Sequence, residues 1–533
     1  LMLIVSFSYW QTIKAYPSGG GAYIVVRDNV GTTSSLVTGA ALLIDYVLTA
    51  AVSAAAGMEA IVSAFPELAF AQIWLGVAAI GVVTIINLRG VRESGSVFSI
   101  PTYVFIFALT ALILVGAYRF STGSLIAVAP VLHETYPPID WILLFAAFSS
   151  GCAALTGIEA ISNGVPAFKA PESRNAQITL LWMVGILATS FLSITALAHL
   201  LGVVPSANET VISKIAREIF GQGSMYYLVQ FSTAMILFLA ANTSFADFPR
   251  VCSILAHDRF LPRQFASLGD RLVFSKGILI LGIVAAALVV IFRGHTHSLI
   301  PLYAVGVFIS FTLSQIGMVR YHLREKEKGW KLSLVFNFIG AIATFVVMLV
   351  IAGTKFLHGA WMVVLIIPIL VFWFRATREH YRKASAQLTL SDDADIGKPI
   401  KNTVVLPISG VHRGVIDAIK YSKSISKDVR AVYVELDLLQ TERLRHTWKK
   451  LNTGIQLVVL PSPYRSVVTP IIEYIRSVER EHDDDVVTVV IPEFVTARWW
   501  EGIYHNQTAF LIRTALLFER GKVVTSVRYH LKR

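Results

Sequence analysis

The sequence predicts an all-α polytopic membrane protein that carries a smaller α/β domain at its C-terminal end. The chain of 533 residues is 55% hydrophobic and only 15% charged, and its mean hydropathy is +0.64. Soluble domains contain about 25% charged residues, so this composition is typical of a chain that crosses a membrane many times. Long apolar segments end near residue 374, and short apolar runs that alternate with amphipathic segments begin near residue 402.

The first part, residues 1–374, is expected to be a transmembrane domain in the lipid bilayer. Residues 1–9 are apolar but too short to span, because a helix needs about 20 residues to cross a bilayer. We expect this run to be the end of a span whose beginning lies outside the chain. Ten full spans are predicted after it, at residues 34–65, 70–87, 98–118, 141–163, 178–203, 225–247, 277–292, 299–321, 332–351 and 359–374.

The distribution of basic residues gives the orientation. Lys and Arg gather in alternate loops, around residues 89–92, 169–174, 250–276 and 320–331. The positive-inside rule places these loops and the C-terminal region in the cytoplasm of a multi-pass cell-membrane protein. The net charge of +12 is explained by these loops and does not indicate binding to nucleic acid.

The C-terminal part is expected to be a soluble domain, residues 402–533, joined by a charged linker, residues 375–401. Apolar runs at 403–409, 431–437, 455–462 and 486–493 predict strands that are buried on both faces. Helical patterns at 415–424, 441–451 and 467–481 alternate with them. This alternation predicts a doubly wound parallel sheet.

The stretch from 151 to 163, GCAALTGIEAISN, places a carboxylate inside an apolar span. A charged group at mid-bilayer costs at least ~2.5 kcal/mol, so Glu159 is a candidate functional residue. Gly151 and Gly157 would allow the helix to open there, and a broken helix beside a carboxylate points to a transporter binding site. A Glu that only hydrogen-bonds between packed helices is the structural alternative.

A second group of oxygen-bearing side chains lies in the predicted span 34–65. Asp45, Thr49 and Ser53 follow at intervals of four residues and therefore share one helix face. A partly dehydrated cation prefers a shell of carbonyl, hydroxyl and carboxylate oxygens. Thr49 and Ser53 equally fit a structural role, because hydroxyls in membrane helices usually bond to backbone carbonyls. We expect Asp247 to pair with Arg250 and Glu59 to face water.

The remaining reactive and metal-binding residue types give no indication of an enzyme. Cys152 and Cys252 lie in or beside apolar segments and give no disulfide framework. The sequence contains no evident nucleophile–base pair and no metal-ligand cluster. We therefore expect no cofactor, and no metal ion beyond a transported cation.

Four motifs resemble the amino acid–polyamine–organocation superfamily and occur in its order: AYPSGGGAY from residue 15, NLRGVRESG from 87, LTGIEAISNGVPAFKAPESRNAQ from 155 and RVCSILAHDRFLPRQFA from 250. The resemblance implies the LeuT-type fold, in which two inverted five-helix repeats are followed by two further helices. Spans one and six are broken around the substrate in this fold. On this alignment residues 1–9 end span two, and span one is missing from the chain.

Narrower features resemble the KimA-type potassium–proton symporters of the KUP family. They are the segment 300–322, the Asp45–Tyr46 pair, the TGIEA motif and a tail that is similar to universal stress proteins. The resemblance implies an ion path made of Asp45, Tyr46, Thr49, Ser53, Thr156, Glu159 and Tyr303. Glu159 or Asp45 would then exchange a proton for potassium. The family also uses an acidic residue and a Tyr of span one, so the site in this chain would be incomplete.

For the tail, the resemblance implies a homodimer through the C-terminal domain and inhibition by cyclic di-AMP. Nucleotide-binding stress proteins carry G-x2-G-x9-G-[ST] after the fourth strand. Here that region reads IPEFVTARWWEGIYHNQ and contains a single glycine, Gly502. We therefore expect regulation or dimerisation rather than ATP binding.

The leading hypothesis is a secondary active transporter that takes up potassium together with protons by alternating access. One alternative is an amino acid or polyamine permease of the same fold, since that substrate would use the same unwound helices. Another, from a different class, is a membrane sensor whose cytoplasmic domain binds a ligand.

Overall fold

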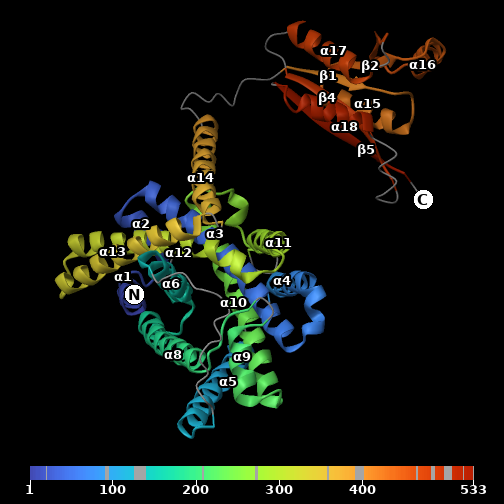
Figure 1. Cartoon of the computed structure of the whole chain (residues 1–533). Coiled ribbons are helices and arrows are strands. Elements are labelled where there is room, and N and C mark those ends of the chain that lie inside the picture. Colours follow the sequence, from blue (N-terminus) through green and yellow to red (C-terminus); the bar gives the residue numbers. More distant parts are fainter. Residues whose placement is uncertain are drawn as a thin grey trace. The chain divides into compact units, whose positions relative to one another are not determined.

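A computed structural model describes residues 1–19, 21–90, 95–124, 140–206, 209–269, 274–356, 359–389, 401–463, 466–481, 486–496, 507–519 and 521–531 (Figure 1). The chain divides into two compact units, Leu1–Thr389 and Leu390–Arg533. The first unit is helical and the second is an α/β unit, and each is described by itself.

The described helices of the first unit include α1 (Met2–Ala15), α2 (Gly21–Asn29), α3 (Thr32–Ala64), α4 (Gln72–Leu88), α5 (Gly95–Ser121), α6 (Trp141–Cys152), α7 (Ile158–Asn163) and α8 (Glu172–Leu200). They continue with α9 (Val211–Phe220), α10 (Ser224–His257), α11 (Ser275–Ile291), α12 (Thr296–Glu325), α13 (Trp330–Lys355) and α14 (Ala360–Leu388). Short 3-10 turns, η1 (Pro66–Ala71), η2 (Ala153–Leu155), η3 (Val165–Ala167) and η4 (Arg263–Phe265), connect some of them.

Eight helices in the described ranges are long and apolar enough to cross a membrane, whereas the sequence predicts ten full spans. The difference comes from two regions. The predicted span 141–163 is divided into α6, η2 and α7, and the predicted span 277–292 is the shorter apolar helix α11. Each of the ten predicted ranges therefore contains helix, and the helical polytopic character is confirmed.

The expected linker begins later than the sequence predicts. Helix α14 continues to Leu388, so residues 375–388 extend the last span as helix instead of forming a loop. The error arises because hydropathy detects where a helix leaves the apolar layer and not where it ends. Residues 390–400 lie outside the described residues.

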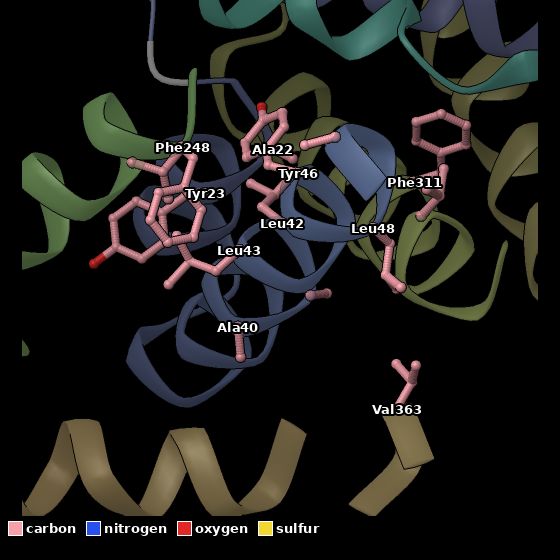
Figure 2. Close-up of a cluster of buried hydrophobic side chains, with 14 of the residues drawn as sticks. Ala22, Tyr23, Ala40, Leu42, Leu43, Tyr46, Leu48, Phe248, Phe311 and Val363 are labelled. Carbon is pink, nitrogen blue, oxygen red and sulfur yellow. The ribbon is translucent and has the colours of Figure 1, made fainter. Parts of the chain in front are cut away.

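Helix α3 lies inside the bundle. It packs against α2, α4, α10, α11, α12 and α14. Figure 2 shows part of this core, with Leu42, Leu43, Tyr46 and Leu48 of α3 near Phe248 and Phe311 from other helices. Helices α3 and α12 are both 72% buried over their most apolar stretch, whereas α4 with η1 is only 11% buried. Most of α3 therefore faces other helices rather than lipid.

Three helices share a buried hydrogen-bonded network on their facing sides. Ser8 of α1 donates to Asn337 of α13, and Asn337 donates to Gln11 of α1. His322 of α12 contacts the same Gln11 oxygen through Nε2, at 3.1 Å. All four side chains are buried. This network joins α1 to the α12–α13 pair.

The second unit contains a parallel sheet in the order β3-β2-β1-β4-β5. Its strands are β1 (Asn402–Pro407), β2 (Asp428–Glu435), β3 (Gln456–Pro461), β4 (Val486–Val495) and β5 (Lys522–His530). Helices α15 (Arg413–Ile425) and α16 (Leu438–Leu451) pack on one face, and α17 (Val468–Glu481) and α18 (Gln507–Leu516) on the other. The predicted doubly wound parallel sheet is confirmed, while α18 and β5 were not anticipated.

Candidate functional site

The membrane helix that carries Glu159 is broken. Helix α6 ends at Cys152, one 3-10 turn follows, and α7 begins at Ile158. Gly157 has φ +94°, a left-handed conformation that a residue with a Cβ adopts only at a cost. Gly151 lies within α6 instead, so the break occurs at the second of the two glycines that the sequence singles out.

The Glu159 side chain supplies a hydrogen-bond acceptor for the backbone at the break. Glu159 is 3% exposed, and both of its carboxyl oxygens accept the Gly157 N–H at 3.1 Å. Unwinding would otherwise leave that N–H without a helix partner in an apolar layer. The Glu159 carboxyl also lies within hydrogen-bonding reach of the Asp45 carboxyl on α3.

Helix α3 supplies the other half of the site. Asp45 is 2% exposed, and Thr49 donates from Oγ1 to Asp45 Oδ1 at 3.5 Å. Ser53 is buried one turn further along the same face. Tyr303 of α12 lies close to Thr49 and to the two carboxyl groups. Three elements that are far apart in the sequence, α3, α7 and α12, thus direct oxygen atoms toward one point.

The remaining two predicted residues border this point. Tyr46 follows Asp45 on α3, and its hydroxyl accepts a hydrogen bond from Asn163 Nδ2 at the end of α7, at 2.5 Å. This bond ties the short helix to α3. Thr156 is half-buried in the unwound turn, next to Gly157. The structure therefore brings Asp45, Thr49, Glu159 and Tyr303 together, with Tyr46, Ser53 and Thr156 adjacent.

One further oxygen atom at the site was missed by sequence reasoning. Tyr9 of α1 is 1% exposed and lies near both Asp45 and Glu159. Its Oη is buried without a hydrogen-bond partner among the described residues. Tyr9 gave no signal in the sequence, because it lies in an apolar run that is too short to span a membrane.

The charge balance limits what this site can hold. No Lys or Arg of the described residues forms an ion pair with Asp45 or Glu159; the nearby Arg250 instead pairs with Asp247 at 3.3 Å. Two carboxylates in contact repel each other strongly in an apolar medium unless a proton or a cation lies between them. Carboxylate, hydroxyl and amide oxygens are suitable ligands for a partly dehydrated alkali cation. The site can therefore take one proton, one monovalent cation, or one of each.

Two acidic residues at the edges of the bundle have structural roles. The predicted Asp247–Arg250 pair is confirmed. Glu59 does not simply face water, because its Oε1 accepts the Thr296 N–H at 3.1 Å at the start of α12. The expectation was wrong because a first-turn N–H of a neighbouring helix offers a partner that hydropathy does not reveal.

Comparison with known proteins gives matches to both units. Residues 1–381 match the amino acid permease family, and residues 400–529 match the KimA potassium transporter C-terminal domain. The chain is 44% identical over 540 residues to the potassium transporter KimA of Bacillus subtilis, covering 100% of this chain and 88% of that protein.

More distant relatives match the membrane part. The low-affinity putrescine importer PlaP of Escherichia coli is 23% identical over 340 residues, which cover 61% of this chain and 72% of that protein. The vacuolar cationic amino acid transporter 4 of Arabidopsis thaliana is 25% identical over 325 residues, which cover 57% and 52%.

Proposed function

Since the chain belongs to the amino acid permease family, and within it to the KimA-type potassium transporters, we propose that it couples potassium uptake to protons through the paired carboxyl groups of Asp45 and Glu159. It is a multi-pass cell-membrane transporter of potassium. The amino acid and polyamine alternatives are not favoured, because those relatives share only 23–25% identity over part of the chain.

The proposed coupling depends mainly on one observation: the two buried carboxyl groups lie close enough to interact, and neither forms an ion pair among the described residues. Fully ionised, the pair has a charge of minus two. One potassium ion and one proton together bring it to neutrality, whereas either alone leaves a net charge that is costly to move through an apolar layer. The loaded site is therefore neutral when both ions travel together.

The residues around the pair have distinct roles in this proposal. Asp45, with the Thr49 and Tyr303 hydroxyls beside it, supplies oxygen ligands for potassium. We assign the proton to Glu159, which lies at the break of the helix. The Gly157 N–H stabilises the ionised form of this carboxyl group, so the proton would bind when the break opens and that bond is released. Ser53 and Thr156 provide hydroxyls along the path, and Tyr46 positions α7 through Asn163.

Alternating access follows from the same break. We propose that the membrane unit has the LeuT-type arrangement of two inverted five-helix repeats, and that α6 and α7 tilt relative to α3 to open the site to either side. The support is the unwound segment between α6 and α7 at a buried carboxylate. A helix as short as α7, separated from α6 by an unwound turn, is suited to such a movement.

For the C-terminal unit we propose a regulatory or dimerisation role, with a fold similar to universal stress proteins and cyclic di-AMP as an effector. The parallel sheet order and the match of residues 400–529 support a dedicated domain. The region expected to lack the phosphate loop extends beyond residue 496, and Gly502 within it lies outside the described residues.

Growth of a potassium-uptake-deficient bacterium at limiting potassium tests the function. The chain is expected to restore growth, and Asp45→Asn is expected to abolish the rescue because it removes a carboxylate ligand from the site. Asp417→Asn is the matched control, since Asp417 is an exposed carboxylate of α15. Equal rescue by Asp45→Asn and wild type, at equal protein levels, would contradict the proposed site.

A further inference from the structure

Helix α16 of the C-terminal unit has one face against the sheet and one toward solvent (Figure 1). Thr441, Leu444 and Trp448 form its inner side and are buried. The outward side carries five exposed charged residues, of which only the first is acidic: Glu442, Arg443, Arg445, Lys449 and Lys450. The four cations form what we call the basic face of α16.

The cations of the basic face are not neutralised within the unit. None of them forms an ion pair with an acidic side chain among the described residues, whereas Arg430, Arg476 and Arg513 elsewhere in the unit each pair with a glutamate. Unpaired Lys and Arg side chains attract an anionic partner across roughly one Debye length, ~8 Å at physiological salt. The basic face therefore fits an anionic surface outside the unit.

Two exposed leucines lie at the start of the same face. Leu438 and Leu439 are 72% and 74% exposed. At spacings of 4, 7 and 11 residues they share two parallel stripes with the cations: Leu439 with Arg443 and Lys450, and Leu438 with Arg445 and Lys449. At the boundary between lipid headgroups and acyl chains, the apolar and the charged side chains would both find favourable surroundings. This combination is typical of a surface that binds a membrane.

The connection to α14 keeps the unit near a membrane. Helix α14 ends at Leu388, which is 14 residues past the predicted end of the last span at residue 374, or about 21 Å at ~1.5 Å per residue. Thirteen residues, 389–401, lie between α14 and the start of β1 at Asn402. A chain of that length can extend to about 45 Å, which is more than the distance back to the edge of the hydrocarbon layer. The tether therefore allows the unit to reach the membrane surface and gives it a high effective concentration there.

We propose that the basic face of α16 binds the anionic surface of the cytoplasmic leaflet, with Leu438 and Leu439 inserted between the lipid headgroups. Four Lys and Arg residues on one amphipathic helix match the size of cluster that binds anionic lipids. Nucleic acid is less suited, because the apolar side chains of this face are leucines, whereas base stacking needs aromatic rings. An acidic protein would have to be recruited, whereas the tether supplies the membrane at all times. This contact does not depend on the ion that the membrane unit transports.

A nitrobenzoxadiazole label at Leu439→Cys tests the proposal with the full chain in lipid nanodiscs. Wild type treated in the same way gives the background, since Cys152 and Cys252 are buried. In discs that contain phosphatidylglycerol the emission should shift to shorter wavelength and be quenched by spin-labelled lipid, whereas in phosphatidylcholine discs, and in about 0.5 M NaCl, it should not. Leu517→Cys is the matched control, because Leu517 is also 74% exposed but follows α18, and its label should not respond to the lipid.

Charge variants of the Leu439→Cys protein separate membrane binding from other partners. Arg443→Gln with Lys450→Gln removes two of the four cations and should weaken binding roughly 30-fold, so the response to phosphatidylglycerol should be lost. Arg480→Gln with Arg528→Gln removes the same charge from exposed positions of α17 and β5 and should retain the response.

Three results would overturn the proposal: no response to phosphatidylglycerol, equal responses in both kinds of disc, or equal responses in the two double variants. A response that needs added RNA or a second copy of the chain, instead of phosphatidylglycerol, would assign the basic face to that partner and also overturn the proposal.

Discussion

At the scale of single residues, Gly157 determines whether the α6–α7 break can form. Its φ of +94° costs a residue with a Cβ about 1–2 kcal/mol, although no atom lies within 4 Å of the added Cβ. Gly151 is helical, and an added Cβ would meet only Phe191, at 4.0 Å. The two glycines therefore differ in backbone conformation and hardly in available space.

Gly157→Ala is expected to lower the thermal unfolding temperature of the purified chain and to reduce potassium transport. Gly151→Ala should leave that temperature unchanged or raise it, since Ala in a helix is favoured over Gly by ~0.5–1 kcal/mol. Thermal unfolding in detergent measures both. Indistinguishable unfolding curves for the two variants would show that the left-handed turn is not required.

Single residues also show what the sequence can and cannot predict about the site. Asp45 and Glu159 were identifiable because a carboxylate in an apolar span is rare and costly. Tyr9 was not, because a Tyr within an apolar helix is ordinary and only packing brings it near the carboxyl groups. The role of Glu59 depends on a backbone N–H of another helix, which no local pattern reveals.

At the scale of elements, the network of Ser8, Gln11, His322 and Asn337 holds α1 against α12 and α13. Asn337 is its centre, since it bonds to both Ser8 and Gln11 and is fully buried. Each buried polar group that loses its partner costs ~1–3 kcal/mol. This amide therefore strengthens the attachment of α1, which carries Tyr9 to the ion site.

Asn337→Leu is expected to destabilise the chain by roughly 2–4 kcal/mol, because it leaves Ser8 and Gln11 without their Asn337 bonds. Thr344→Val on the same helix removes the acceptor of a hydrogen bond from Thr312. The Thr312 hydroxyl still has a partner in this variant, because it also donates to the Phe308 carbonyl. The substitution should cost only about 1 kcal/mol. Thermal unfolding compares the two, and an equal effect would argue against the network.

Elements differ in how well the sequence predicts them. The ten apolar ranges all contain helix, because an uninterrupted run of about 20 apolar residues has few other solutions in a membrane. The end of α14 was misplaced by 14 residues, from 374 to 388, because its last turns are polar and follow no hydropathy signal. Strand β5 was missed because Thr525 and Ser526 interrupt its valines, as expected of an edge strand that is half-buried.

At the scale of the whole molecule, the two units differ in where they place polar and apolar side chains. The membrane unit buries its polar groups in its interior and presents apolar side chains such as Phe70 and Leu114 outward. The C-terminal unit buries apolar strands between two helical layers. His412, before α15, contacts the Phe494 ring of β4, and burial lowers its pKa from the usual value near 6.5.

The C-terminal unit is therefore expected to loosen in acid. Because the folded unit holds His412 with a lowered pKa, the unfolded chain binds the proton more tightly, and the stabilisation present above about pH 6.5 declines below it. Hydrogen exchange of β1 and β4 amides should accelerate between about pH 7 and pH 5.5, relative to the intrinsic exchange rate at each pH. His412→Gln should reduce this acceleration; an unchanged pH dependence would mean that another group is responsible.

The central claim is that Glu159 carries the proton that accompanies potassium. Rubidium uptake into proteoliposomes, measured with acidic and alkaline external buffers, tests it most directly. Wild type and Glu59→Gln, whose carboxyl lies outside the ion site, should take up rubidium faster from the acidic side. Glu159→Gln leaves a single carboxylate for the cation to neutralise, so its uptake should no longer depend on pH. A Glu159→Gln protein with the wild-type pH dependence would contradict the account.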